Sequence, residues 1–132
     1  MRIKINTKKN VTVLTILDDI ILDTLSEFQQ VIDSAATGES IYLAIDFSHL
    51  EFISSRGLGS LGKLADALRK KGGDIKLFSM RSEVKKLFDI CGLSKILDIC
   101  STEEEALLCW GEQVGIIEKR LLWSIKHHDG DC

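Results

Sequence analysis

The spacing of apolar residues changes along the N-terminal part of the chain. Residues 2–6 alternate charged and apolar side chains, and residues 11–17 are mostly apolar, so both segments predict β-strands with a turn at 8–10. From Leu22 the apolar side chains recur at steps of three and four, which is the pattern of an amphipathic helix. Gly38 stands where such a helix would end.

An apolar run at residues 41–45 marks the centre of the predicted sheet. Continuous runs of this kind are typical of a strand that is covered on both faces. A second helix follows, and its apolar side consists of Leu58, Leu61, Leu64, Ala65 and Leu68. Residues 72–73 are glycines and end this helix, and residues 74–79 predict the next strand.

The pattern continues with a third helix and a last strand. Val84, Leu87, Phe88 and Cys91 form the apolar side of that helix, which stops at Gly92. Residues 95–100 predict a short strand, and Ser101 with Glu104 forms a capping box for a fourth helix. The order β-β-α-β-α-β-α-β-α predicts an α/β domain with a mixed sheet and helices packed on it.

The predicted domain spans residues 1–110, and residues 111–132 form a C-terminal extension. Val114, Ile117 and Leu121 have helical spacing, so the extension either adds a helix that packs back on the domain or contacts a partner. The last residues, 127–132, are expected to be a frayed tail.

Composition narrows the class of protein. The chain has 132 residues, of which 45% are apolar, and this fits one domain with a core of its own. A net charge of −3 gives no general attraction to nucleic acid or to an anionic membrane. No apolar stretch is long enough for a membrane span or a secretory signal, so we expect a cytoplasmic protein.

The cysteines indicate neither a zinc site nor a redox motif. Four are present and none forms a Cys-x-x-Cys pair. Cys91, Cys100 and Cys109 have apolar neighbours, which predicts buried, reduced thiols that pack as small apolar side chains, whereas Cys132 ends the tail.

The segment at 46–59 carries the most information about function. It begins where the central strand ends and runs into the second helix, so Ser54 and Ser55 fall at the start of that helix. Serine there can simply cap free backbone N–H groups. Gly57 and Gly59 lie inside the helix, where glycine is unfavourable, and this predicts the close approach of another backbone from the sheet or from a docking protein.

Residues 46–59 read Asp-Phe-Ser-x-Leu-x-Phe-Ile-Ser-Ser-x-Gly-Leu-Gly, which resembles the signature of STAS domains, the family of bacterial anti-sigma factor antagonists. The similarity runs from about Val11 to about Leu108, and the segments 71–74 and 84–93 also resemble the family. The predicted order of elements agrees with this resemblance. It implies a phospho-switch, in which the unmodified antagonist binds an anti-sigma factor serine kinase, a histidine-kinase-like ATPase, and the phosphorylated form releases it.

The resemblance places the phosphate acceptor at Ser55, with Ser54 as the fallback. The partner-binding residues that it implies are Asp46, Ser54, Ser55, Arg56, Gly57 and Gly59. The chain departs from the family in two places. Ser54 stands where many antagonists have aspartate, and residues 18–21 replace the usual Gly-x-Leu-Asp, which predicts a different loop there.

The alternatives to this function are a constitutive scaffold, an enzyme and a metal-binding protein. A STAS domain that is never phosphorylated would serve as a scaffold or as a cytosolic subunit of a lipid-transport complex. Catalysis by Ser55 would need a base such as His49, His127 or His128, but the Gly-x-Ser-x-Gly motif is absent, so no enzyme activity is expected. The tail groups His127, His128, Asp129, Asp131 and Cys132 could bind a metal, but a tail fixes no geometry, and no cofactor is predicted.

Overall fold

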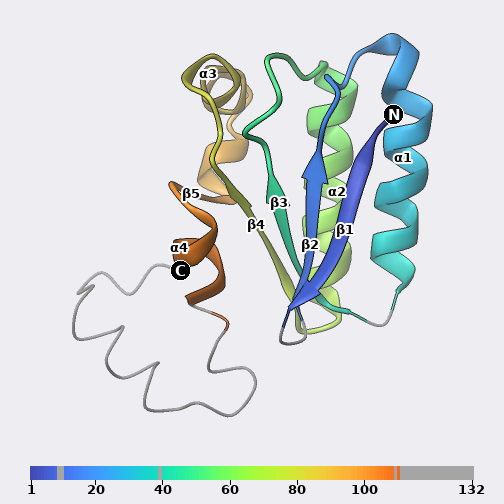
Figure 1. Cartoon of the computed structure of the whole chain (residues 1–132), viewed down its shortest axis with the longest axis vertical. Coiled ribbons are helices and arrows are strands. Elements are labelled where there is room, and N and C mark those ends of the chain that lie inside the picture. The colour runs from blue at the N-terminus through green and yellow to red at the C-terminus, as the bar shows by residue number, and fades with distance from the viewer. Residues whose placement is uncertain (9–10, 39, 109, 111–132) are drawn as a thin grey trace.

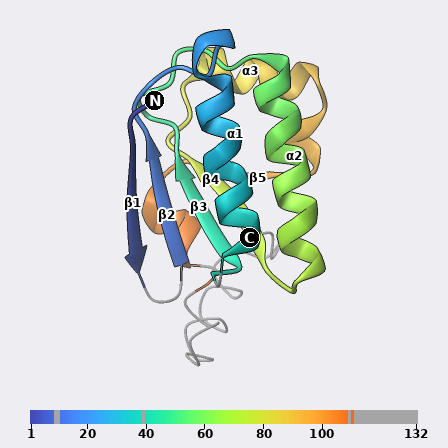
Figure 2. The same ribbon diagram turned by 90° about the vertical axis from the view of Figure 1, so that its right-hand side faces the viewer.

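The computed structural model describes residues 1–8, 11–38, 40–108 and 110. Helices lie on both faces of a five-stranded sheet (Figures 1 and 2). The strands are β1 (Ile3–Lys8), β2 (Val11–Ile16), β3 (Tyr42–Asp46), β4 (Asp74–Phe78) and β5 (Asp98–Cys100). The helices are α1 (Leu22–Thr37), α2 (Ser55–Lys70), α3 (Ser82–Ile90) and α4 (Glu103–Leu108), with a 3₁₀ helix at Leu93–Lys95. The predicted order of strands and α-helices is confirmed.

The sheet has the strand order β1-β2-β3-β4-β5. β1 pairs with β2 in the antiparallel direction, and the other neighbouring strands are parallel. Because β2, β3, β4 and β5 run the same way, the loops that follow β2 and β3 emerge at the same edge of the sheet. That edge holds the segment between β3 and α2, as Figure 1 shows.

The core confirms that β3 is covered on both faces. Leu43 and Ile45 belong to the large cluster that α1 and α2 cover, together with the predicted stripe of α2 and with Leu25, Phe28 and Ile32 of the predicted α1 stripe. The prediction was wrong for Leu22, which begins α1 and is exposed. Ala44 points to the opposite face, where it packs in a second cluster with Phe78 and Trp110 beside α4. The alternation along one strand therefore supplies both layers of the core.

The prediction for the last strand was wrong at its start. The sequence suggested a strand from residue 95, but β5 begins only at Asp98. Gly92 adopts a left-handed conformation with φ 83°, which ends the turn after α3 and starts a 3₁₀ helix at Leu93–Lys95. These residues form the turn back toward the sheet. Only residues 98–100 of the predicted strand at 95–100 therefore pair with β4.

The side-chain cap of α4 lies one residue later than predicted. The Thr102 hydroxyl, not that of Ser101, accepts a hydrogen bond from the Glu105 backbone N–H at 3.1 Å. The Glu105 carboxylate in return accepts one from the Ser101 backbone N–H at 3.2 Å. The predicted box of Ser101 with Glu104 was therefore wrong: Thr102 caps the helix, and the Glu105 carboxylate bonds the residue before this cap.

The cysteine prediction holds for Cys100 and fails for Cys91. Cys100 is buried on β5, and burial raises the pKa of its thiol to about 11. Cys91, the C-cap residue of α3, is exposed. Cys109 and Cys132 lie outside the described residues.

A buried lysine on β4 is a feature that the sequence did not predict. The side chain of Lys76 is fully buried, and its ammonium group contacts the Asp98 carboxylate at 2.8 Å. The same ammonium lies 5.4 Å from the ring centre of Trp110, which covers it. A buried charge needs such partners because its desolvation is costly.

Candidate partner-binding site

Ser54 and Ser55 take different places at the start of α2. Ser54 is the N-cap, and its hydroxyl accepts a hydrogen bond from the Gly57 backbone N–H at 3.2 Å. Ser55 is the first helical residue and is exposed. Within the part of the chain that the structure describes, its hydroxyl has no hydrogen-bond partner. The capping function predicted for a serine here therefore belongs to Ser54, and Ser55 presents a free hydroxyl.

The first turn of α2 also presents donors to solvent. The first N–H groups of a helix have no partner within it, and here Ser54 satisfies only that of Gly57. The N–H groups of Ser55 and Arg56 have no hydrogen-bond partner among the described residues. Arg56 is exposed, and its guanidinium forms no ion pair there either. The region around the Ser55 hydroxyl is therefore favourable for an anion.

A neighbouring loop fixes the position of the two serines. Ile20, in the loop after β2, forms a parallel bridge with Ile53. The Ser54 N–H donates to the Ile20 carbonyl at 2.8 Å, and the Ile20 N–H donates to the Phe52 carbonyl at 3.2 Å. The two loops thus form a short extension of the sheet, and α2 starts directly after it.

Asp19 joins the same two loops through its side chain. Its Oδ1 atom accepts hydrogen bonds from the backbone N–H groups of Glu51, at 2.8 Å, and Phe52, at 3.3 Å. Sequence reasoning noted residues 18–21 only as a departure from the family pattern and missed this function. A carboxylate directly after a strand was the available signal, because such a group can bond the backbone of a neighbouring loop.

The neighbouring carboxylate, Asp18, holds the N-terminus of the chain. It accepts hydrogen bonds from the side chain and from the backbone N–H of Arg2 at 2.7 Å each. The side-chain bond is the main reason why the pKa of Asp18 falls to about 2. The start of β1 is therefore fastened to the loop that supports the serines.

The two glycines of the motif differ in their surroundings. A Cβ atom at Gly57 would lie 2.7 Å from Cγ2 of Ile20 and 2.9 Å from Cγ1 of Ile53, so a close approach does require glycine there. The approaching atoms belong to side chains, however, and not to the backbone that we predicted. A Cβ atom at Gly59 would have no neighbour within 4 Å among the described residues, so the approach of the sheet was wrong for Gly59, and that of a docking protein stays a prediction.

Asp46 and His49 shape the loop between β3 and α2. The Oδ1 atom of Asp46 accepts a hydrogen bond from the Ser48 backbone N–H at 2.8 Å, which closes a turn at the end of β3. The Nδ1 atom of His49 lies 3.2 Å from the hydroxyl of Ser48 and not beside Ser55. Asp46 therefore acts on the shape of the loop, and its prediction as a partner contact stays untested.

Exposed apolar side chains lie on the two joined loops and on the first residue of α1. Leu22 is 83% exposed, Phe52 46% and Ile21 39%. We call these three residues, together with Ser55 and Arg56, the acceptor-loop surface. Single exposed apolar residues need no explanation, but three on two chain segments that are joined beside Ser54 are a feature of interaction surfaces.

The remaining predictions concern the tail residues, a metal site and a membrane span. The tail residues His127, His128, Asp129 and Asp131 lie outside the described residues, as does the whole extension 111–132. Among the residues with described positions, no three His, Cys, Asp or Glu side chains gather as metal ligands would. The described helices also include none with both the length and the apolar character needed to cross a membrane.

Residues 2–106 match the family model of the STAS domain. The anti-sigma-B factor antagonist of Listeria monocytogenes is 29% identical over 82 residues, which cover 62% of this chain and 72% of that protein. An anti-sigma factor antagonist from Mycobacterium paratuberculosis has a similar structure, with a TM-score of 0.73, 24% identity, and coverage of 80% of this chain and 90% of the other. The unphosphorylated antagonist SpoIIAA aligns with a TM-score of 0.68 and 19% identity over 80% of this chain and 93% of its own.

Proposed function

The chain belongs to the STAS domain family, and we propose that it is an anti-sigma factor antagonist whose phosphate acceptor is Ser55. The free, exposed hydroxyl of Ser55 is the observation that carries this proposal. Ser54 is a poorer acceptor because its hydroxyl is half-buried and caps the helix. The relatives named as anti-sigma factor antagonists support the same function.

Phosphorylation of Ser55 is compatible with the folded domain. The added group carries about −1.5 to −2 charges and lies where the helix dipole and unbonded N–H groups favour an anion. The partner of the unmodified form is an anti-sigma factor serine kinase of the histidine-kinase-like class. Its docked surface would have to bury the new charge, which is costly without a compensating cation. Phosphate therefore leaves the domain folded and releases the kinase.

The acceptor-loop surface supplies the affinity in this proposal. Leu22 and Phe52 bring apolar area to the contact, and Arg56 brings a cation that has no partner among the described residues. Burial of a leucine side chain against a partner is worth about 1.5–3 kcal/mol. A contact centred on these side chains would cover Ser55, which explains why one phosphate can break it.

The acceptor is tested by intact mass after incubation with a candidate kinase and ATP. The wild type should gain one phosphate and Ser55→Ala none. Ser54→Ala is the matched control, because it removes a hydroxyl one position away, and it should still be phosphorylated. If Ser54→Ala abolishes the gain and Ser55→Ala does not, the fallback acceptor is the correct one. If no kinase modifies the wild type, the domain is a constitutive STAS scaffold.

The contact surface is tested by affinity for the same kinase. Leu22→Ala should weaken binding roughly tenfold, since a loss of about 1.4 kcal/mol corresponds to that factor. Ile90→Ala is the control, because Ile90 is 82% exposed, as Leu22 is at 83%, but lies on α3. Equal effects of the two substitutions would show that the acceptor-loop surface does not form the contact.

A further inference from the structure

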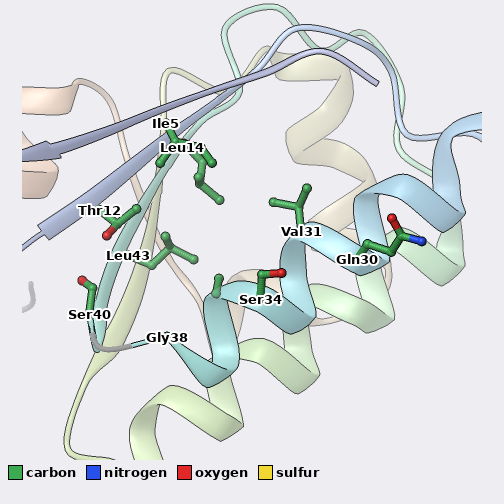
Figure 3. A pocket seen from close by; sticks show the side chains of 10 residues that line it. Ile5, Thr12, Leu14, Gln30, Val31, Ser34, Gly38, Ser40 and Leu43 are labelled. Carbon is green, nitrogen blue, oxygen red and sulfur yellow. The ribbon is translucent and has the colours of Figure 1, made fainter.

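A groove separates α1 from the strands beneath it. It has a volume of about 480 Å³ and lies between the C-terminal half of α1 and the strands β1, β2 and β3. In Figure 3, Leu14 and Leu43 of the sheet face Val31 and Ser34 of α1 across this space. Ligand sites in proteins commonly have volumes of about 300–1,000 Å³ and apolar walls, so the groove has the size of a small-molecule site.

The packing of α1 explains why the groove exists. The backbone of α1 approaches that of α2 more closely than that of any strand, and the groove lies between the C-terminal half of α1 and the sheet. β1 is the edge strand, and none of the described helices lies directly over it, as Figure 2 shows. Ile5 of β1, which is 67% exposed, forms the outer wall of the groove. A ligand in the groove would remove this apolar side chain from water.

The residues that line the groove favour an uncharged ligand. Although 28% of the chain is charged, none of the described residues that line the groove is Asp, Glu, Lys, Arg or His. Leu14, Leu43 and Val31 supply apolar walls. The hydroxyls of Thr12 and Ser34 also line it, and neither has a hydrogen-bond partner within the described residues. These walls complement a ligand that has an apolar body and an uncharged polar group able to form hydrogen bonds.

We propose that this groove binds a small uncharged amphiphile, with its aliphatic part between α1 and the sheet and its hydroxyl or carbonyl group at Thr12 or Ser34. The site is distinct from the acceptor-loop surface. The groove faces the C-terminal half of α1, whereas Ser55 lies at the opposite edge of the sheet, where the parallel strands end (Figure 1). Ligand binding in the groove does not depend on the phosphorylation of Ser55 proposed above.

The test is an NMR titration of the full ¹⁵N-labelled chain with n-octanol and, separately, with octanoate. We expect saturable amide shifts at Thr12 and Ser34 with n-octanol, and weaker binding of octanoate because the described lining residues offer no cation for its carboxylate. Thr12→Val removes one hydroxyl at nearly constant shape and should weaken n-octanol binding roughly threefold to tenfold if that hydroxyl holds the ligand's polar group.

A variant whose groove is filled by a side chain gives the decisive test of the proposed ligand site. Ser34→Trp places an indole in the groove from the exposed side of α1 and should abolish saturable binding. Ser26→Trp is the matched control, because Ser26 is an exposed serine of the same helix that does not line the groove, and it should bind as the wild type does. The proposal is overturned if n-octanol gives no saturable shifts, if octanoate binds equally well, or if Ser34→Trp and Ser26→Trp behave alike.

Discussion

The close approach at Gly57 allows a quantitative test of how the start of α2 is packed. In Gly57→Ala the added carbon would lie 2.7 Å from Cγ2 of Ile20 and 2.9 Å from Cγ1 of Ile53. Both isoleucines are fully buried, and each of these atoms is attached directly to Cβ. They can therefore move away only if the side chain changes its rotamer or the backbone shifts.

The expected change in the free energy of unfolding is the difference between two opposing contributions. Overpacking of this kind costs about 1–3 kcal/mol. The replacement of a helical glycine by alanine returns up to about 1 kcal/mol, and less in the first turn. We therefore expect Gly57→Ala to lower the free energy of unfolding by about 1–2 kcal/mol. Gly59→Ala, whose new Cβ would have no neighbour within 4 Å, should instead stabilise the domain by up to about 1 kcal/mol.

Urea unfolding followed by far-ultraviolet circular dichroism measures both variants. A difference of about 2 kcal/mol between them should separate their midpoints by about 1 M, given the usual dependence of stability on urea. Gly57→Ala with the same midpoint as Gly59→Ala, or a higher one, would refute the account of Gly57 as a packing position. The pair is informative because both substitutions add the same methyl group to the same helix.

Two more predictions concern the neighbourhood of this helix. Ser54→Ala should lower the free energy of unfolding by about 1 kcal/mol because it removes the N-cap, whereas Ser55→Ala should leave it nearly unchanged; chemical denaturation compares them. The hydrogen bond from Arg2 lowers the pKa of Asp18 to about 2, below its unfolded value, so this pair stabilises the fold above about pH 4 and loses that effect as the pH falls toward 2. Asp18→Asn should accordingly show a smaller decrease in Tm than the wild type between pH 4 and pH 2, and identical decreases would contradict the pairing.

The order of elements could be predicted from the sequence because its periodicities are long and uninterrupted. The stripe at residues 22–32 and the run at 41–45 each determine one kind of structure, and both elements were placed correctly, although Leu22 at the start of the stripe is exposed. The errors fall at element ends. β5 starts late because the left-handed turn at Gly92 leads into a 3₁₀ helix, and such a turn has no periodicity of its own.

At the candidate site, the sequence predicted which segment matters but not how it is held. The serines at the helix start were visible, and yet only the structure assigns the cap to Ser54 and leaves the hydroxyl of Ser55 free. The bonds from Asp19 to residues 51–52 join positions far apart in the chain, which no local pattern encodes. Lys76 was likewise assigned only to a strand, because its burial depends on Asp98 and Trp110 from later elements.

The bridge between the loop after β2 and the start of α2 also limits how the domain can be re-engineered. A chimera that grafted residues 46–59 alone onto another STAS domain would bring both serines and both glycines. It would omit the Asp19 carboxylate and the Ile20 carbonyl that hold the backbone of that segment in place. The transferable unit therefore consists of two discontinuous pieces, 18–22 and 46–59, and a library that exchanges specificity between antagonists should recombine them together.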